Sequence, residues 1–82
     1  MKAQEKAFAL RTGQIFQDAD RRIKGDRQRW ILVQAILMNR VDVRAVFCVG
    51  EPTRAQFDRG HPSRISSVRL ISNSYRFIRE PA

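Results

Sequence analysis

The side chains of this chain that could support acid–base or nucleophilic chemistry lie in one short segment. Asp58, His61 and Ser63 follow one another closely, between Arg54 and Arg64. A nucleophile and its base normally come from separate elements that hold them rigidly in a cleft. Here all three lie in one stretch bounded by glycine and proline, so the spacing argues against an enzyme.

The sequence also gives little support for a metal or cofactor site. The single histidine and the single cysteine, Cys48, cannot form a closed zinc site without carboxylates. Asp18 and Asp20 are paired carboxylates, but the arginines that follow them oppose the capture of a cation. The sequence has neither a phosphate-binding loop nor a dinucleotide fingerprint. We therefore predict no metal and no cofactor.

The charge of the chain points to an anionic partner. The 82 residues include 16 Lys and Arg against 8 Asp and Glu, a formal charge of +8, and 13 of the basic residues are arginine. Arginine presents a planar fork of donors that suits phosphates and carboxylates. A basic surface on so small a domain favours nucleic acid as the partner.

Two segments concentrate the candidate binding residues. The first spans residues 21–29 and the second residues 50–64, and together they supply the predicted site: Arg21, Arg22, Lys24, Arg27, Arg29, Arg54, Phe57, Arg59 and Arg64. In the functional interpretation the arginines hold phosphates and Phe57 stacks on a base. In the alternative, the carboxylates at positions 18, 20 and 26 neutralise the first segment and Phe57 folds back onto the core.

The hydrophobic pattern predicts that the elements that position these residues are strands. We expect strands at 14–17, 29–37, 41–47, 64–71 and 75–78, with a tight helical turn near 68–70. The run at 29–37 is apolar on both faces, which favours a strand buried on both sides over a helix capped by Asp26. In the run at 41–47, Asp42 and Arg44 share one face and the apolar residues the other. Asn39 is expected to take the left-handed conformation in the turn at 38–40.

Five aromatic residues are expected to form most of the core, and Cys48 is expected to be a small buried hydrophobe. The aromatic residues are Phe16, Trp30, Phe47, Tyr75 and Phe77. Residues 18–28 and 50–63 are predicted to be loops. Residues 1–12 are predicted to be an N-terminal tail or short helix, and residues 13–82 a single domain.

The order of these features resembles the SH3-like and KOW-like barrels of small bacterial and phage proteins. The elements that carry the resemblance are Gly13-Gln14-Ile15-Phe16, Asp18-x-Asp20-x-Arg22, residues 27–36, Arg40-Val41-x-Val43, Arg64-Ile65, Arg69-Leu70 and Tyr75-Arg76-Phe77-Ile78. The resemblance implies an all-β fold, a small five-stranded SH3-like barrel. The chain departs from that pattern in a long loop or hairpin excursion at about 48–63.

These observations predict a non-enzymatic module that binds DNA or RNA, of the kind found among mobile-element and phage regulators. One alternative is a protein-binding inhibitor or adaptor, such as a phage anti-defence or anti-CRISPR-type protein that acts on a larger complex. A second is a homo-oligomeric structural subunit. No apolar run approaches the roughly 18–20 residues that span a bilayer, so we expect a cytoplasmic monomer or homodimer with no membrane partner.

Overall fold

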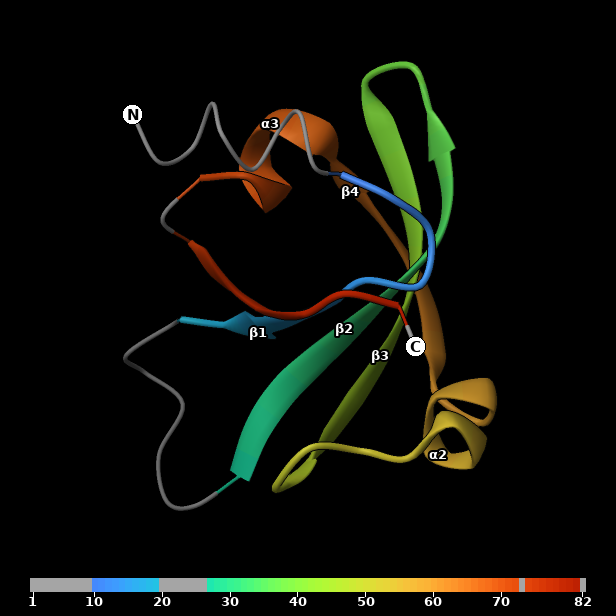
Figure 1. The fold of residues 1–82 in the computed structure, drawn as a ribbon, viewed down its shortest axis with the longest axis vertical. Helices are drawn as coiled ribbons and strands as arrows, with labels where there is room; N and C mark the ends of the chain where they lie inside the picture. Colours follow the sequence, from blue (N-terminus) through green and yellow to red (C-terminus); the bar gives the residue numbers. More distant parts are fainter. Residues whose placement is uncertain (1–9, 20–26, 73, 82) are drawn as a thin grey trace.

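The computed structural model describes residues 10–19, 27–72 and 74–81, in which five strands form one antiparallel sheet (Figure 1). The strands are β1 (Ile15–Asp18), β2 (Arg27–Leu37), β3 (Arg40–Val49), β4 (His61–Ser66) and β5 (Tyr75–Arg79). Two short helices, α2 (Arg54–Asp58) and α3 (Ser67–Leu70), flank β4. The strand order is β4-β3-β2-β1-β5. The predicted five-stranded, mostly-β domain is confirmed.

The predicted closure into a barrel is not found. β4 and β5 are the two edges of the sheet, and within the described ranges no ladder of hydrogen bonds joins them. The helix α3 follows β4 directly, where residues 68–70 were expected to make a helical turn. Its Leu70 is fully buried in the same cluster as Ile65 of β4 and Tyr75 of β5. An apolar side chain thus packs between the two edges in place of a hydrogen-bonded contact.

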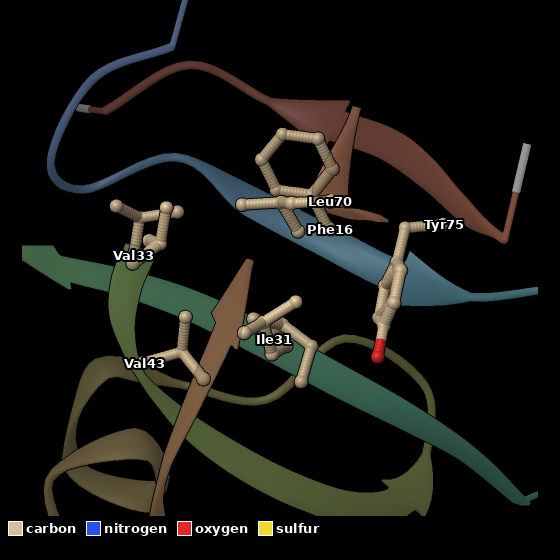
Figure 2. Close-up of a cluster of buried hydrophobic side chains, with 8 residues drawn as sticks. Phe16, Ile31, Val33, Val43, Leu70 and Tyr75 are labelled. Carbon is tan, nitrogen blue, oxygen red and sulfur yellow. The ribbon is translucent and has the colours of Figure 1, made fainter. Parts of the chain in front are cut away.

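β2 is buried on both faces from Trp30 to Val33, as its sequence predicts, whereas Ile36 and Leu37 at its end are exposed. On one face, here called the inner face, Ile31 and Val33 join a cluster that Figure 2 shows between the strands. The whole cluster is Phe16, Ile31, Val33, Val41, Val43, Ile65, Leu70 and Tyr75. On the opposite, outer face, Trp30 and Leu32 pack with Phe57 of α2. Because successive side chains of a strand point to opposite faces, one apolar run supplies both clusters.

The aromatic residues follow the prediction with one exception. Phe16, Trp30 and Tyr75 are buried, and the half-buried Phe77 meets Phe16 edge to face at 5.5 Å between ring centroids. Phe47 is 51% exposed. It lies two positions beyond Ala45, the last residue of β3 that pairs with β4. Cys48 is half-buried against the outer cluster.

The segment 48–63 is not the predicted long excursion. β3 continues to Val49, and α2 and the start of β4 take up most of the remainder. A capping box begins the helix: the backbone N–H of Gln56 donates to Thr53 Oγ1 at 3.3 Å, and that of Thr53 donates to Gln56 Oε1 at 2.8 Å. Phe57 is then buried on the outer cluster. The Thr-x-x-Gln spacing was the sequence signal for this helix.

The turn between β2 and β3 also corrects an expectation. Met38, and not Asn39, takes the left-handed conformation, with φ of 46°. Of the predicted N-terminal segment, residues 1–9 lie outside the described residues, and residues 10–12 form neither helix nor strand. The buried Gln14 ties this end of the chain to the other. Its side chain accepts a hydrogen bond from the Arg11 N–H at 2.8 Å and donates to the Glu80 carboxylate at 3.3 Å.

The loop before α2 is fixed to β5 by a two-pronged ion pair. Arg79 Nε donates to Glu51 Oε2 at 2.7 Å, and Arg79 Nη2 donates to Glu51 Oε1 at 2.8 Å. These hydrogen bonds hold the pKa of the Glu51 carboxyl below its ordinary value, against a smaller opposing effect of desolvation. A carboxyl whose pKa is lowered by folding stabilises the fold above its unfolded pKa, and this contribution is lost as the pH falls through the folded value.

We therefore expect Glu51→Gln to lower stability slightly at neutral pH, with the difference from the unmodified protein vanishing in acid. Both side chains face water, so added salt should also reduce the difference. The difference in the free energy of unfolding is measured by urea unfolding of the two proteins at a series of pH values from 7 to strongly acidic. A difference that persists below the folded pKa of Glu51 would show that the substitution acts through packing instead.

Candidate nucleic-acid interface

The positive charge of the described residues exceeds what their carboxylates can neutralise. Each of the five described carboxylates forms an ion pair with a different arginine: Asp18 with Arg29, Asp42 with Arg64, Glu51 with Arg79, Asp58 with Arg54, and Glu80 with Arg11. Six arginines form no ion pair within the described part of the chain: Arg27, Arg40, Arg44, Arg59, Arg69 and Arg76. Their positions decide where an anion would bind.

Arg40 and Arg44 lie on the outer face of β3. They alternate with Val41 and Val43, which are buried in the inner cluster, so both arginine side chains leave the opposite side of the strand. They are four positions apart along the strand, a span of about 13 Å. In the neighbouring strand Arg64 is the register partner of Asp42, which lies between the two arginines in β3. We call Arg40, Arg44 and Arg64 the arginine face.

Hydrogen bonds fix two of these three side chains. Arg64 Nε donates to Asp42 Oδ1 at 2.8 Å, which neutralises the carboxylate in the middle of the arginine face. Arg44 Nη1 donates to the Gly60 carbonyl at 3.0 Å, beside Arg59 at the end of α2. A guanidinium has five N–H donors. Both side chains therefore keep donors available for a ligand.

An open groove of about 630 Å³ lies at the Arg44 and Arg64 part of this face, and Arg40 lies outside its lining. Its lining residues are Gln34, Ala35, Asp42, Val43, Arg44, Pro62, Ser63 and Arg64. A bulge lies among these residues: the register of β2 against β3 shifts between Val33 and Ala35, so Gln34 has no partner in the ladder. The small Ala35 then lies opposite Asp42. Two arginines and one already-paired carboxylate make this groove suited to a chain of phosphates.

A second, smaller cleft of about 400 Å³ opens on the inner side, between the two sheet edges. Arg29, Arg64, Arg69 and Tyr75 line it, together with Ile65 and two serines of β4, and Arg64 is paired with Asp42. Arg29 is already engaged, because its Nη1 donates to Asp18 Oδ2 at 3.2 Å and to Tyr75 Oη at 3.4 Å. This cleft therefore carries less uncompensated charge than the arginine face.

The structure brings together few of the residues that the sequence singled out. Arg21, Arg22 and Lys24 lie outside the described residues. Arg29 projects from the inner side of β2, as Ile31 and Val33 do, and so faces away from Arg44.

In the second segment Phe57 is 1% exposed, so its predicted role in base stacking is wrong and the core alternative is confirmed. Arg54 is exposed on α2, where its Nε lies 3.5 Å from Asp58. Arg59 ends that helix, and Arg64 alone belongs to the arginine face. Arg40 and Arg44 were not among the predicted site residues, although the alternation at 41–47 already placed Arg44 on the polar side of a strand.

Comparison with known proteins adds no relative. No family model, curated protein or solved structure matches this chain. Among the residues that the structure describes, no helix has the length and apolar character to cross a membrane. In the same residues no three side chains of His, Cys, Asp or Glu gather as metal ligands would. A proposal for the function therefore depends on the charge and shape of the sheet.

Proposed function

We propose that this protein is a non-enzymatic nucleic-acid-binding module whose arginine face holds the phosphate backbone. The observation that carries the proposal is the placement of Arg40 and Arg44. Neither forms an ion pair with a described carboxylate, and both lie on one side of β3. Asp42, the one carboxylate among the groove's described lining residues, is already bound to Arg64. An extended polyanion can therefore approach this face without meeting free negative charge.

The fold supports a role of this kind without deciding it. We infer that the sheet is an open relative of the SH3-like barrel. In the sequence a short helix, α3, connects β4 to β5, and in the sheet these two strands form the opposite edges. Folds of this type carry many functions, and only the arginine face distinguishes a nucleic-acid-binding function from the others.

A salt series tests the proposal. Fluorescence anisotropy with labelled duplex DNA, single-stranded DNA and RNA should show binding that weakens as salt increases. If Arg40 and Arg44 each meet one phosphate while Arg64 stays paired with Asp42, the logarithm of the association constant should fall with the logarithm of salt at a slope of about −1.8. Additional phosphate contacts make the slope steeper. Binding that is absent at low salt, or unaffected by salt, would reject the proposal.

Removing the carboxylate from the arginine face should strengthen binding. Asp42→Asn deletes the negative charge and frees Arg64, which adds one phosphate contact and makes affinity at 0.1 M salt about eightfold higher. The same titration measures this. Asp58→Asn is the matched control, because it removes an equal charge from an ion pair on α2. Equal gains for both variants would mean that only net charge matters.

A protein partner is the second candidate function, and one observation favours it. At the end of the hairpin away from the β2–β3 turn, Phe47 and Val49 are exposed, and their register partners in β2 are Arg29 and Arg27. An aromatic residue beside arginines is typical of the energetic centre of protein interfaces. Capture of a partner that survives nuclease treatment and is lost with Phe47→Ser would favour this function over the first.

A further inference from the structure

The turn between β2 and β3 carries an exposed apolar surface. Four of the six exposed large apolar side chains in the described part of the chain lie here: Ile36, Leu37, Met38 and Val68. Val68 belongs to α3, which starts beside the turn because the Ser67 N–H donates to the Asn39 carbonyl at 2.9 Å. Figure 1 shows the β2–β3 turn at one end of the long axis. We call these four side chains the apolar tip.

Folding does not account for Met38. Its side chain is 98% exposed and so adds nothing to either core cluster. Its backbone is left-handed, with φ of 46°, a conformation that costs an L-residue other than glycine or asparagine about 1–2 kcal/mol. Glycine would satisfy this turn better. A strained, exposed and apolar residue is more readily explained by contact with a partner.

The apolar tip is continuous with the arginine face. Leu37 is the register partner of Arg40, so the two side chains leave the same side of the sheet. Leu37 is 48% exposed, and Arg40 is the first residue after the turn. The next positions along that side are Asp42 and Arg64, which neutralise one another, and then Arg44. An apolar end therefore adjoins a row of cations.

We propose that the apolar tip inserts between base pairs of duplex DNA while the arginine face holds the adjacent phosphates. This inference rests on the proposed function. Leu, Ile and Met are the side chains that proteins use as wedges to unstack a base step and kink the duplex from its minor groove. The partner is DNA because strands and β-ribbons dock in the grooves of B-form DNA, and apolar wedges that enter from the minor groove kink that duplex. Double-stranded RNA is recognised mostly through its shape, its 2′-hydroxyls and its phosphates.

Unstacking can be measured separately from binding. The probe is a duplex of about 20 base pairs that contains 2-aminopurine, whose fluorescence rises when its neighbours no longer stack on it. The unmodified protein should raise this fluorescence at saturation. Leu37→Gln combined with Met38→Gly should abolish the rise and lower affinity about tenfold, through the loss of buried apolar surface. The salt slope should not change, because every charge remains.

A second readout separates this role from a structural one. Met38→Gly alone relieves the left-handed strain, so it should raise the urea midpoint of unfolding while it reduces the fluorescence rise. Val49→Gln is the matched control. It removes a 66% exposed apolar side chain from the other end of the hairpin and should leave the rise intact.

The outcomes distinguish the two proposals. Salt-dependent binding with no fluorescence rise, or with a rise that the tip variants retain, overturns the insertion and leaves the arginine face supported. Absence of binding to both DNA and RNA overturns both proposals, whereas absence of DNA binding alone overturns only the insertion. Tighter binding to a hairpin RNA than to the duplex, with the same loss in the tip variants, overturns the choice of DNA.

Discussion

Phe57→Ala should destabilise the protein by about 3–5 kcal/mol, the usual effect of removing a large buried aromatic side chain. Phe57 is 1% exposed and packs on the outer side of β2 against Trp30 and Leu32. It is the only member of that cluster that comes from α2. A chain of this length has a total stability of about 4–12 kcal/mol. The variant should therefore lose a large share of it, as a lower urea midpoint in equilibrium unfolding.

Phe47→Ala is the control for this loss. It deletes the same side chain from β3, where the ring is half-exposed, and should cost no more than about 1 kcal/mol. The comparison also tests the assignment of the outer cluster as a second core. Similar midpoints for the two variants would mean that α2 does not pack on β2 in solution.

Phe57 also shows where sequence-based prediction reaches its limit. Its neighbours are Arg54 and Arg59, and this local context fits an exposed stacking ring as well as a core anchor. The Thr53–Gln56 capping box predicts a helical turn, and one face of such a turn, here the face that carries Phe57, can be buried. Trp30, which packs in the same cluster as Phe57, lies far away in the sequence, and only the tertiary fold brings the two side chains together.

Strands whose local pattern agrees with their tertiary environment were predicted well. The alternation at 41–47 placed Val41 and Val43 in a core, and the apolar run at 29–37 is buried on both sides from Trp30 to Val33, but not at its exposed end, Ile36 and Leu37. Closure of the barrel was beyond the sequence. It depends on whether β4 and β5 meet, which the tilt and stagger of all five strands determine together. The left-handed Met38 was missed because asparagine takes this conformation more readily.

The arginine face escaped prediction for a related reason. Sequence analysis groups arginines by proximity along the chain, whereas a sheet groups them by face and register. Asp42 and Arg64 are 22 residues apart and share an ion pair. Neighbours in the sequence can lie on opposite faces: in β3, Val43 points to the inner face, whereas Asp42 and Arg44 on either side of it point to the outer face. A search that combined the strand alternation with a hairpin-like pairing of 41–47 and 61–66 would have found this face.

Arg40→Gln combined with Arg44→Gln should weaken nucleic-acid binding about 60-fold at 0.1 M salt. Each arginine that meets a phosphate releases about 0.9 counterion, which is worth about eightfold in affinity at this concentration. The slope of the logarithm of affinity against the logarithm of salt should become shallower by about 1.8. Glutamine keeps the polarity of both positions and can still donate to the Gly60 carbonyl that Arg44 contacts, so the fold should persist. Anisotropy titrations across a salt series measure both quantities.

The decisive comparison is with Arg27→Gln combined with Arg76→Gln. These two arginines are also exposed and form no ion pair within the described residues, so the double variant has the same net charge. They lie at the start of β2 and on β5, away from the groove. Long-range attraction depends on net charge, so it would weaken binding equally in both double variants. A contact between the arginine face and phosphates weakens it mainly in the first. Equal losses would therefore contradict a defined interface.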